Sequence, residues 1–498
     1  SFFTIFFCPC SYSRRHVKSV DGFVLGGRSV GPWLTAFAYG TSYFSAVVFV
    51  GYAGQFGWKY GIASTWIGIG NALIGSLLAW VVLGRRTKVM TQHLRAKTMP
   101  DFFGQRYGSK ALKIVASVIV FVFLIPYTAS VYNGLSRLFG MAFNIPYTWC
   151  VIAMAVFTAI YVILGGYMAT AINDFIQGII MLFGIVAVIA SVLNGQGGFM
   201  EAVSKMAQIP SDVPATMGQP GAFTSFFGPD PLNLLGVVIL TSLGTWGLPQ
   251  MIGKFYAIKD EKSINTGTVI STLFAIVISG GCYFLGGFGR LFDSAEIYNA
   301  ETGAVVYDSI IPSMLSKLPD ILIGIVVVLV LSASMSTLSS LVLTSSSTMT
   351  LDLLKDNIMK EMSEKKQIIT MQILIVFFIV VSVVIALDPP TFIAQLMGIS
   401  WGALAGAFLA PFLYGLYWKG VTRAGVWAGF IAGVGITVSN MFIGYIASPI
   451  NAGAAAMVAG LVIVPLVSLV TPKLKKEDVD EIFTCYEEKV VSTKKRNL

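Results

Sequence analysis

The feature that most constrains this chain is the repetition of apolar runs long enough to cross a lipid bilayer. A membrane helix needs about 20 apolar residues, and about twelve such runs follow one another here. Only 11% of the 498 residues are charged, and the mean hydropathy is +0.78. Soluble domains carry about 25% charged residues. We therefore expect an all-α polytopic membrane protein.

The predicted spans are separated by short polar segments and two longer loops. We place the spans at residues 31–56, 62–84, 111–143, 147–165, 170–194, 231–257, 266–289, 319–347, 366–388, 391–417, 424–446 and 453–471. The apolar residues 1–12 are too short to cross, and we interpret residues 1–30 as a truncated first helix followed by a basic segment. The expected total is therefore about 12–13 spans.

The distribution of basic residues gives the orientation. If the segment 13–28 is cytoplasmic, the segments on that side hold 28 of the 33 Lys and Arg residues. Three of these 28 lie at 254–262, at the end of the sixth span. This is the positive-inside bias of a membrane protein. It predicts a plasma-membrane protein whose C-terminus is cytoplasmic, and it accounts for most of the net charge of +9.

Two groups of five spans have a similar layout. Because each group has an odd number of spans, the second group enters the membrane from the opposite side to the first. Such inverted repeats are typical of transporters. We predict a first repeat at 31–194 and a second at 231–417. An extracellular loop at 195–230 joins them, and two peripheral helices (418–471) and a cytoplasmic tail (472–498) follow.

The first span of each repeat is expected to be broken. The first contains Tyr39-Gly-Thr-Ser-Tyr-Phe-Ser-Ala46, and the second contains Gly244-Thr-Trp-Gly-Leu-Pro-Gln250. Proline removes a helical hydrogen bond and clashes with the preceding turn. Breaks at matching positions of two repeats are the best sequence indication of a midplane binding site.

The eighth span ends in a stretch crowded with hydroxyl side chains, Leu331 to Ser347. At helical spacing, Ala333, Ser336, Thr337 and Ser340 share one face and Ser339 lies at its edge. Hydroxyls and freed carbonyls are ligands for a hard cation. The alternative is that these hydroxyls bond back to their own helix or pack against neighbouring helices.

Asp174 is the notable acid inside a predicted span, and Gln177 lies one turn further on. An ionisable residue within a membrane helix is by default a candidate functional residue. The alternative is an acid placed near a helix N-terminus, where the macrodipole favours it.

Polar and aromatic side chains at the breaks and on facing spans are candidates for solute contacts. Singly, each is better explained by packing between helices, but together they fit a pocket with an aromatic wall and few polar anchors. They are Ser42, Tyr43, Ser45, Tyr127, Tyr132, Asn133, Trp246, Gln250 and Gln395.

Three motifs together resemble the sodium:solute symporter family of proline, pantothenate, sugar and sialic acid carriers. They are Asp21-Gly-Phe-Val-Leu-Gly-Gly-Arg-Ser-Val-Gly-Pro-Trp33, Gly165-Gly-Tyr-x6-Asp174-x2-Gln177 and Ala333-x2-Ser336-Thr337. The resemblance implies a LeuT-like fold of inverted five-helix repeats with extra peripheral helices. It also implies sodium as the coupling ion.

The resemblance implies particular sodium ligands. Carbonyls of Thr41, Phe44 and Ala333 and hydroxyls of Ser336 and Thr337 match the shared sodium site of the family. Asp174, Ser336, Ser339 and Ser340 match a second site that some members have, so one or two sodium ions are expected.

Two departures bear on the solute. Proline carriers have an aspartate in the first break, where this chain has Tyr43, and pantothenate-type members have a tyrosine there. No arginine lies deep in the third span, which argues against sialic acid. We expect sodium-coupled import of a small polar solute, an amino acid or a carboxylate such as proline or pantothenate, by alternating access.

Other functions stay open from the sequence. A sugar or sialic acid carrier, a transporter-like solute sensor acting through its tail, and a sodium channel are the alternatives. An enzyme is not expected, because both histidines, His16 and His93, lie in basic loops and the spans lack paired carboxylates. The expected partners are the solute, sodium and the lipid bilayer, without nucleic acid or an obligate protein partner.

Overall fold

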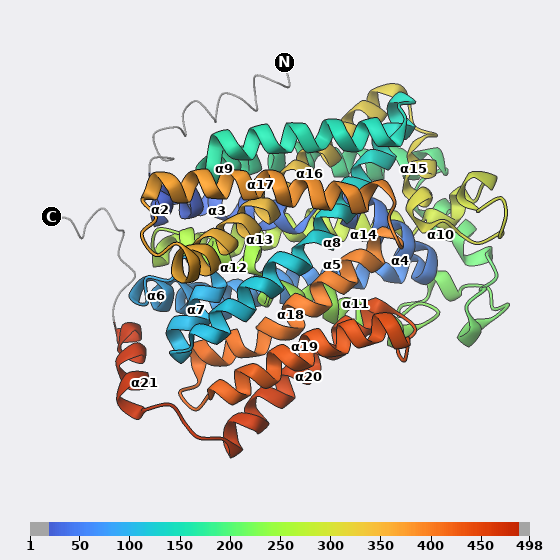
Figure 1. The fold of residues 1–498 in the computed structure, drawn as a ribbon. Coiled ribbons are helices and arrows are strands. Elements are labelled where there is room, and N and C mark those ends of the chain that lie inside the picture. Colours follow the sequence, from blue (N-terminus) through green and yellow to red (C-terminus); the bar gives the residue numbers. More distant parts are fainter. Residues whose placement is uncertain (1–18, 488–498) are drawn as a thin grey trace.

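The computed structural model describes residues 19–487, which fold into a bundle of helices without a β-strand. The helices run roughly side by side along the long direction of the molecule (Figure 1). The predicted truncated helix at the N-terminus falls mostly outside the described residues.

The helices follow the order of the predicted spans. Their bounds are α2 Val20–Leu25, α3 Pro32–Tyr43, α4 Ala53–Tyr60, α5 Thr65–Gly70, α6 Arg85–His93, α7 Met99–Tyr107, α8 Lys110–Phe143, α9 Tyr147–Gly195, α10 Phe199–Gln208, α11 Pro231–Leu243, α12 Pro249–Ala257, α13 Glu261–Ala275, α14 Gly281–Gly286, α15 Ile310–Leu315, α16 Asp320–Thr348, α17 Glu364–Leu387, α18 Ile393–Tyr417, α19 Arg423–Ile443, α20 Pro449–Val470 and α21 Lys476–Phe483.

Ten helical segments in the described part of the chain are long and apolar enough to cross a membrane. Two further segments correspond to predicted spans. They are the shorter apolar helix Tyr147–Ile160 and the interrupted helix formed by α3 and α4. Large apolar side chains such as Phe183 and Phe442 are 76% and 84% exposed on the outside of the bundle. Lipid is the solvent that suits such a surface.

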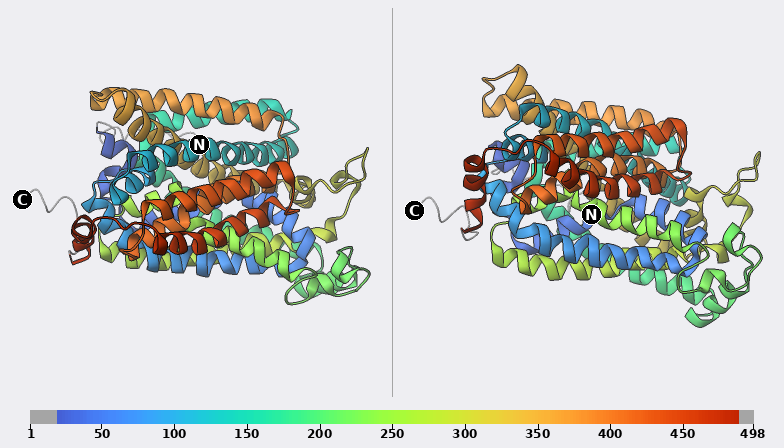
Figure 2. Two further views of the ribbon diagram at one scale, coloured as in Figure 1. Left: turned by 60° about the horizontal axis from the view of Figure 1, so that its bottom comes forward. Right: turned by 90° about the horizontal axis from the view of Figure 1, so that it is seen from below.

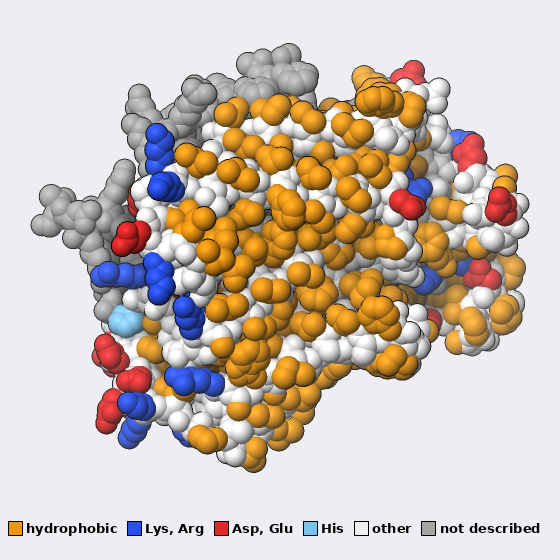
Figure 3. All heavy atoms as spheres, viewed as in Figure 1, with side chains coloured by type: hydrophobic (Ala, Val, Ile, Leu, Met, Phe, Trp, Pro, Cys, Tyr) orange, Lys and Arg blue, Asp and Glu red, His pale blue; other side chains and the backbone are white. Residues whose placement is uncertain are grey.

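Charged residues gather at the two ends of the bundle, with most visible Lys and Arg at one of them (Figure 3). We name this the basic end; it carries α6, α7 and α21 (Figure 1). The opposite end, here the loop end, carries α10 and the loop 290–318, which project beyond the bundle (Figure 2).

Both predicted helix breaks are confirmed. α3 ends at Tyr43, and Phe44 is extended with φ −99° and ψ 122° before the chain resumes helical geometry at Val47–Tyr52 and α4. α11 ends at Leu243, a short turn Gly244–Trp246 follows, and Pro249 starts α12. Proline is tolerated there because the first helical residue needs no amide partner.

Gly166 divides α9 into the two predicted spans. Its φ of 55° and ψ of −160° interrupt the helix, and a Cβ there would lie 2.9 Å from the Phe23 ring. A residue with a side chain is strained at this φ and would collide with α2. Asp174 therefore lies in the second half of α9, two turns past the kink. That position is beyond the first turn, where a macrodipole effect would act.

Two glycines allow α4 and α14 to touch through their backbones. A Cβ on Gly57 would lie 1.9 Å from the Gly286 carbonyl oxygen, and a Cβ on Gly286 would lie 2.1 Å from the Ala53 carbonyl oxygen. Close contact between small residues is the usual means of association between membrane helices.

Substituting Gly57→Ala should force these helices apart. Overpacking of this kind typically costs about 1–3 kcal/mol of folding free energy, so we expect a lower unfolding temperature in detergent. Gly324→Ala is the matched control, because a Cβ on this exposed residue of α16 meets nothing within 4 Å. Equal unfolding temperatures for the two variants would contradict the packing argument.

Candidate sodium and solute site

The break in the first core helix is stabilised by two serine hydroxyls. The Ser45 hydroxyl accepts a hydrogen bond from the Val47 amide at 3.2 Å, and the Ser334 hydroxyl of α16 accepts one from the Ala46 amide at 3.1 Å. These bonds satisfy amides that have no partner at the start of a helix. They leave the last carbonyls of α3 directed toward α16.

The Thr337 hydroxyl meets three carbonyl oxygens at this break. Its Oγ1 lies 3.1 Å from the Thr41 oxygen, 3.2 Å from the Phe44 oxygen and 3.2 Å from the Ala333 oxygen. A hydroxyl has one proton and can donate to only one of them. All four residues are at most 1% exposed. The Ala333 oxygen also has the amide four residues on in α16, so the surplus acceptors are the oxygens of Thr41 and Phe44. A small cation is the partner that such an oxygen-rich, donor-poor cluster suits.

Ser336 extends the cluster. Its hydroxyl donates to Thr41 Oγ1 at 2.8 Å, and the Thr41 hydroxyl in turn donates to the Phe37 carbonyl at 2.8 Å. The structure thus brings together all five residues of the predicted first sodium site. Hard cations with ligands at about 2.4 Å have neighbouring octahedral ligands about 3.4 Å apart. The distances from Thr337 Oγ1 to the carbonyl oxygens of Thr41, Phe44 and Ala333, 3.1, 3.2 and 3.2 Å, are slightly shorter than this value.

Removing the Thr337 hydroxyl should weaken sodium binding. We expect Thr337→Val, which is nearly isosteric, to raise the sodium concentration for half-maximal thermal stabilisation at least about tenfold, equivalent to about 1.4 kcal/mol. Thr337→Ser keeps the hydroxyl and is the matched control. An unchanged sodium dependence in Thr337→Val would show that this hydroxyl only packs α16 against α3.

The residues of the predicted second sodium site also lie close together. Lys254 of α12, which was not predicted to belong to this site, lies among them. Lys254, counted above among the basic residues of a cytoplasmic segment, is 3% exposed, and its ammonium donates to Ser340 Oγ at 3.0 Å. The Ser340 hydroxyl lies 2.8 Å from that of Ser42. Asp174 is fully buried and interacts electrostatically with Lys254. The count of basic residues assigned Lys254 to a cytoplasmic segment, whereas its side chain is buried within the bundle.

Tyr43 and Tyr127 of the predicted solute contacts lie around one aromatic cluster. Their rings lie 5.8 and 5.9 Å from that of Trp401 on α18. The Tyr127 hydroxyl lies near Ser45 and Trp401 but has no hydrogen-bond partner, and neither does the Trp401 indole nitrogen. Gly244 of the second break lies against Trp401, where a Cβ would be 2.6 Å from the ring. This cluster joins both breaks.

Trp401 was missing from the predicted solute contacts. The tenth span is apolar almost throughout, so its sequence Ser400-Trp401-Gly402 gave no sign of which helical face meets the breaks. Asn71 was missed too. Its amide donates to the Ser279 hydroxyl at 2.8 Å, and it accepts from Ser242 at 3.2 Å, beside the second break.

The other predicted solute contacts are not part of the aromatic cluster. The Trp246 indole donates to the Ile74 carbonyl, and Tyr132 faces Thr158 of α9. Gln395 accepts a hydrogen bond from Thr391, which lies just before α18. Gln250 lines a cavity of about 50 Å³ toward the basic end, and Asn133 accepts from Arg137.

A larger cavity of about 540 Å³ lies toward the loop end. Arg137 and Asp308 line it, with their Nε and Oδ2 atoms 3.9 Å apart, and Asp308 also accepts from the Ile393 amide at the start of α18. Burial raises the pKa of the Asp308 carboxyl to about 6, although Arg137 and the Ile393 amide oppose this rise.

This raised pKa predicts a pH-dependent stability. In the unfolded chain the carboxyl ionises near pH 3.9, whereas in the folded protein it stays protonated up to about 6, so stability falls as pH rises through this window. The loss is up to about 3 kcal/mol and is complete above about pH 7. Thermal unfolding between pH 4 and 8 should show this loss in the wild type and not in Asp308→Asn.

The exposed Asp320→Asn substitution at the same end is the matched control. Parallel pH profiles for the wild type and Asp308→Asn would contradict the assignment of this titration to Asp308.

Two broken helices that meet beside an oxygen cluster and an aromatic cluster are typical of a cation-coupled secondary transporter. The sodium:solute symporter family model matches residues 23–433. The chain therefore belongs to the sodium:solute symporter family and is a sodium-coupled solute symporter, as the motifs predicted.

Similar proteins agree with this assignment. The chain is 30% identical over 482 residues to a protein of Staphylococcus aureus named sodium/proline symporter, covering 93% of this chain and 89% of that protein. Its fold matches that of a Na⁺-coupled sialic acid symporter solved in a substrate-bound outward-open state, with a TM-score of 0.74 and 14% identity. The match covers 95% of this chain and 97% of that one. The fold also matches that of Mhp1, a nucleobase-cation-symport-1 family transporter, with a TM-score of 0.54 and 13% identity. This match covers 92% of this chain and 98% of that one. The predicted LeuT-like fold class is confirmed.

Proposed function

We propose that this protein imports a small amino acid or carboxylate together with sodium, which binds where the Thr337 hydroxyl meets the carbonyls of Thr41, Phe44 and Ala333. That convergence is the observation that carries the proposal. The ion would satisfy the surplus oxygens of Thr41 and Phe44 and hold the broken helix against α16. Helix α3 would then present Tyr43 and Ser45 to the solute.

The solute would lie against the cluster of Tyr43, Tyr127 and Trp401. The unpartnered Tyr127 hydroxyl and Trp401 indole supply a few polar contacts within an apolar wall, as small-molecule sites usually do. The name of the Staphylococcus aureus relatives favours an amino acid such as proline. Tyr43 in place of the aspartate of proline carriers favours a carboxylate of the pantothenate type.

Transport would require only that sodium bind more tightly to the state that also binds solute. By the positive-inside bias, the basic end and the C-terminus would face the cytoplasm of a plasma membrane. Each net positive charge carried across 100 mV would add about 2.3 kcal/mol of driving force.

Uptake into proteoliposomes tests the proposal. The panel is labelled proline, pantothenate, short monocarboxylates, a sugar and sialic acid, each with and without an inward sodium gradient. We expect accumulation of proline or a carboxylate that requires the gradient and falls at least about tenfold in Thr337→Val. Thr337→Ser is the control that should retain uptake.

Other outcomes would favour other functions. Accumulation of a sugar or sialic acid would change the solute but keep the coupling. Binding of a solute without its transport would favour a sensor. Sodium flux that needs no solute and far exceeds carrier rates would favour a channel.

A further inference from the structure

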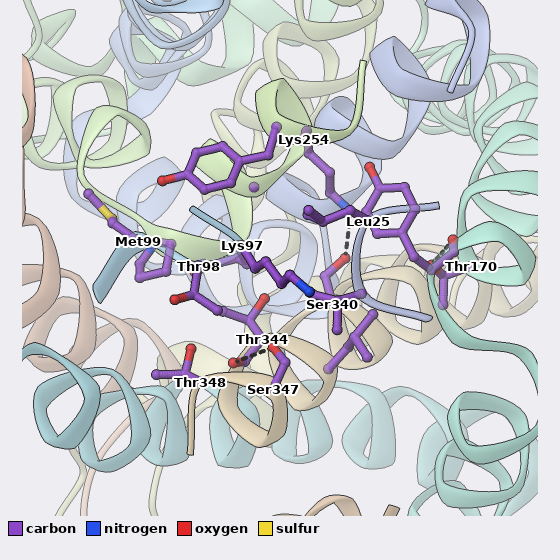
Figure 4. A pocket seen from close by; sticks show the side chains of 17 residues that line it. Leu25, Lys97, Thr98, Met99, Thr170, Lys254, Ser340, Thr344, Ser347 and Thr348 are labelled. Atoms are coloured by element: carbon purple, nitrogen blue, oxygen red, sulfur yellow. Dashed lines mark hydrogen bonds between the residues drawn. The ribbon is translucent and has the colours of Figure 1, made fainter. Parts of the chain in front are cut away.

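Lys254 places its side-chain nitrogen in the predicted second sodium site. Its ammonium bonds the Ser340 hydroxyl at 3.0 Å and lies 5.1 Å from the centre of the Tyr167 ring (Figure 4). Tyr167 and Asp174 belong to the same half of α9, and Asp174 lies close enough to Lys254 for their charges to interact, although the two side chains do not form a direct ion pair. A buried ammonium requires such compensation, because an isolated charge in the bundle interior is costly.

The hydroxyls of this site are already engaged. The Ser340 oxygen accepts from Lys254 and lies 2.8 Å from the Ser42 hydroxyl. The Ser339 hydroxyl donates to the Ser336 carbonyl of its own helix, and the Ser336 hydroxyl donates to Thr41 in the first sodium site. Among the four predicted ligands, Asp174 alone has side-chain oxygens without a hydrogen bond of good geometry, and the Ser336 hydroxyl lies near them.

The charges lead to the same conclusion. Asp174 and Lys254 together are neutral, whereas a sodium ion beside them would leave one uncompensated positive charge in a fully buried site. The cation and the ammonium would also repel each other over a short distance in a medium of low dielectric constant. The described part of the chain contains no group of three or more His, Cys, Asp or Glu residues that could hold a metal ion.

We infer that the Lys254 ammonium takes the place of a second sodium ion, so that one sodium, at the Thr337 cluster, accompanies each solute. The inference rests on the proposed function for that first ion. It revises the expectation of a second ion held by Asp174, Ser336, Ser339 and Ser340. A lysine cannot leave with the solute, so the solute gradient would follow the first power of the sodium gradient instead of its square.

Counting bound sodium on purified protein tests the inference independently of transport. Equilibrium dialysis with ²²Na⁺ should give about one ion per chain in the wild type and about two in Lys254→Met, where Asp174 loses its counter-charge. Lys254→Arg keeps the charge and should bind about one ion. Lys254→Met combined with Asp174→Asn should return the count to about one, since the new site then lacks its carboxylate.

Several outcomes would overturn the inference. Two ions bound by the wild type, or one ion bound by a folded Lys254→Met variant, would show that the lysine does not replace sodium. If Lys254→Met fails to fold, Lys254→Gln decides, since a folded Lys254→Gln variant that binds one ion would contradict the inference. A wild type that binds no sodium, or a count that Thr337→Val leaves unchanged, would instead refute the proposed first site.

Discussion

The contact between the Thr337 hydroxyl and the carbonyls of the interrupted helix is the interaction on which the rest of the structure depends. The carbonyl oxygens of Thr41, Phe44 and Ala333 each lie within 3.2 Å of the Thr337 hydroxyl, and all four residues are buried. A hydroxyl alone cannot satisfy them all. The junction of α3 and α16 is therefore only partly stable by itself. A site that needs an ion to complete it is a natural point for ion binding to change the stability of one conformation.

The surrounding structure makes this incomplete junction possible. Serine hydroxyls from both helices cap the amides that restart the chain after Phe44, so the break leaves surplus acceptors but no unpaired amide at Ala46 or Val47. The second break approaches the same region through Gly244, which lies against Trp401. Trp401 also contacts Tyr43, the last residue of α3. The Tyr43 ring therefore links the proposed ion site to the aromatic cluster of Tyr43, Tyr127 and Trp401.

The sequence predicted the features that have a local cause. Apolar runs locate the crossings, and Gly, Ser and Pro locate both breaks, because these residues act on their own segment of backbone. Helical spacing groups Ala333, Ser336 and Thr337, and the family resemblance adds Thr41 and Phe44 to the residues proposed to bind sodium. Trp401 and Asn71 could not be found this way, since the face that an apolar helix turns inward depends on packing between distant spans.

Lys254 shows most clearly where local reasoning fails. It is the sixth residue of α12, close to Lys259 and Lys262, and by sequence it is indistinguishable from the basic residues that flank a span. Its burial depends on Ser340 and Asp174, which come from helices 86 and 80 residues away in the chain. A charge that aids insertion at a membrane surface and a charge that neutralises an intramembrane carboxylate have the same sequence signal. The two differ in their consequences for transport, because under the inference above only the second would set how many ions the carrier moves.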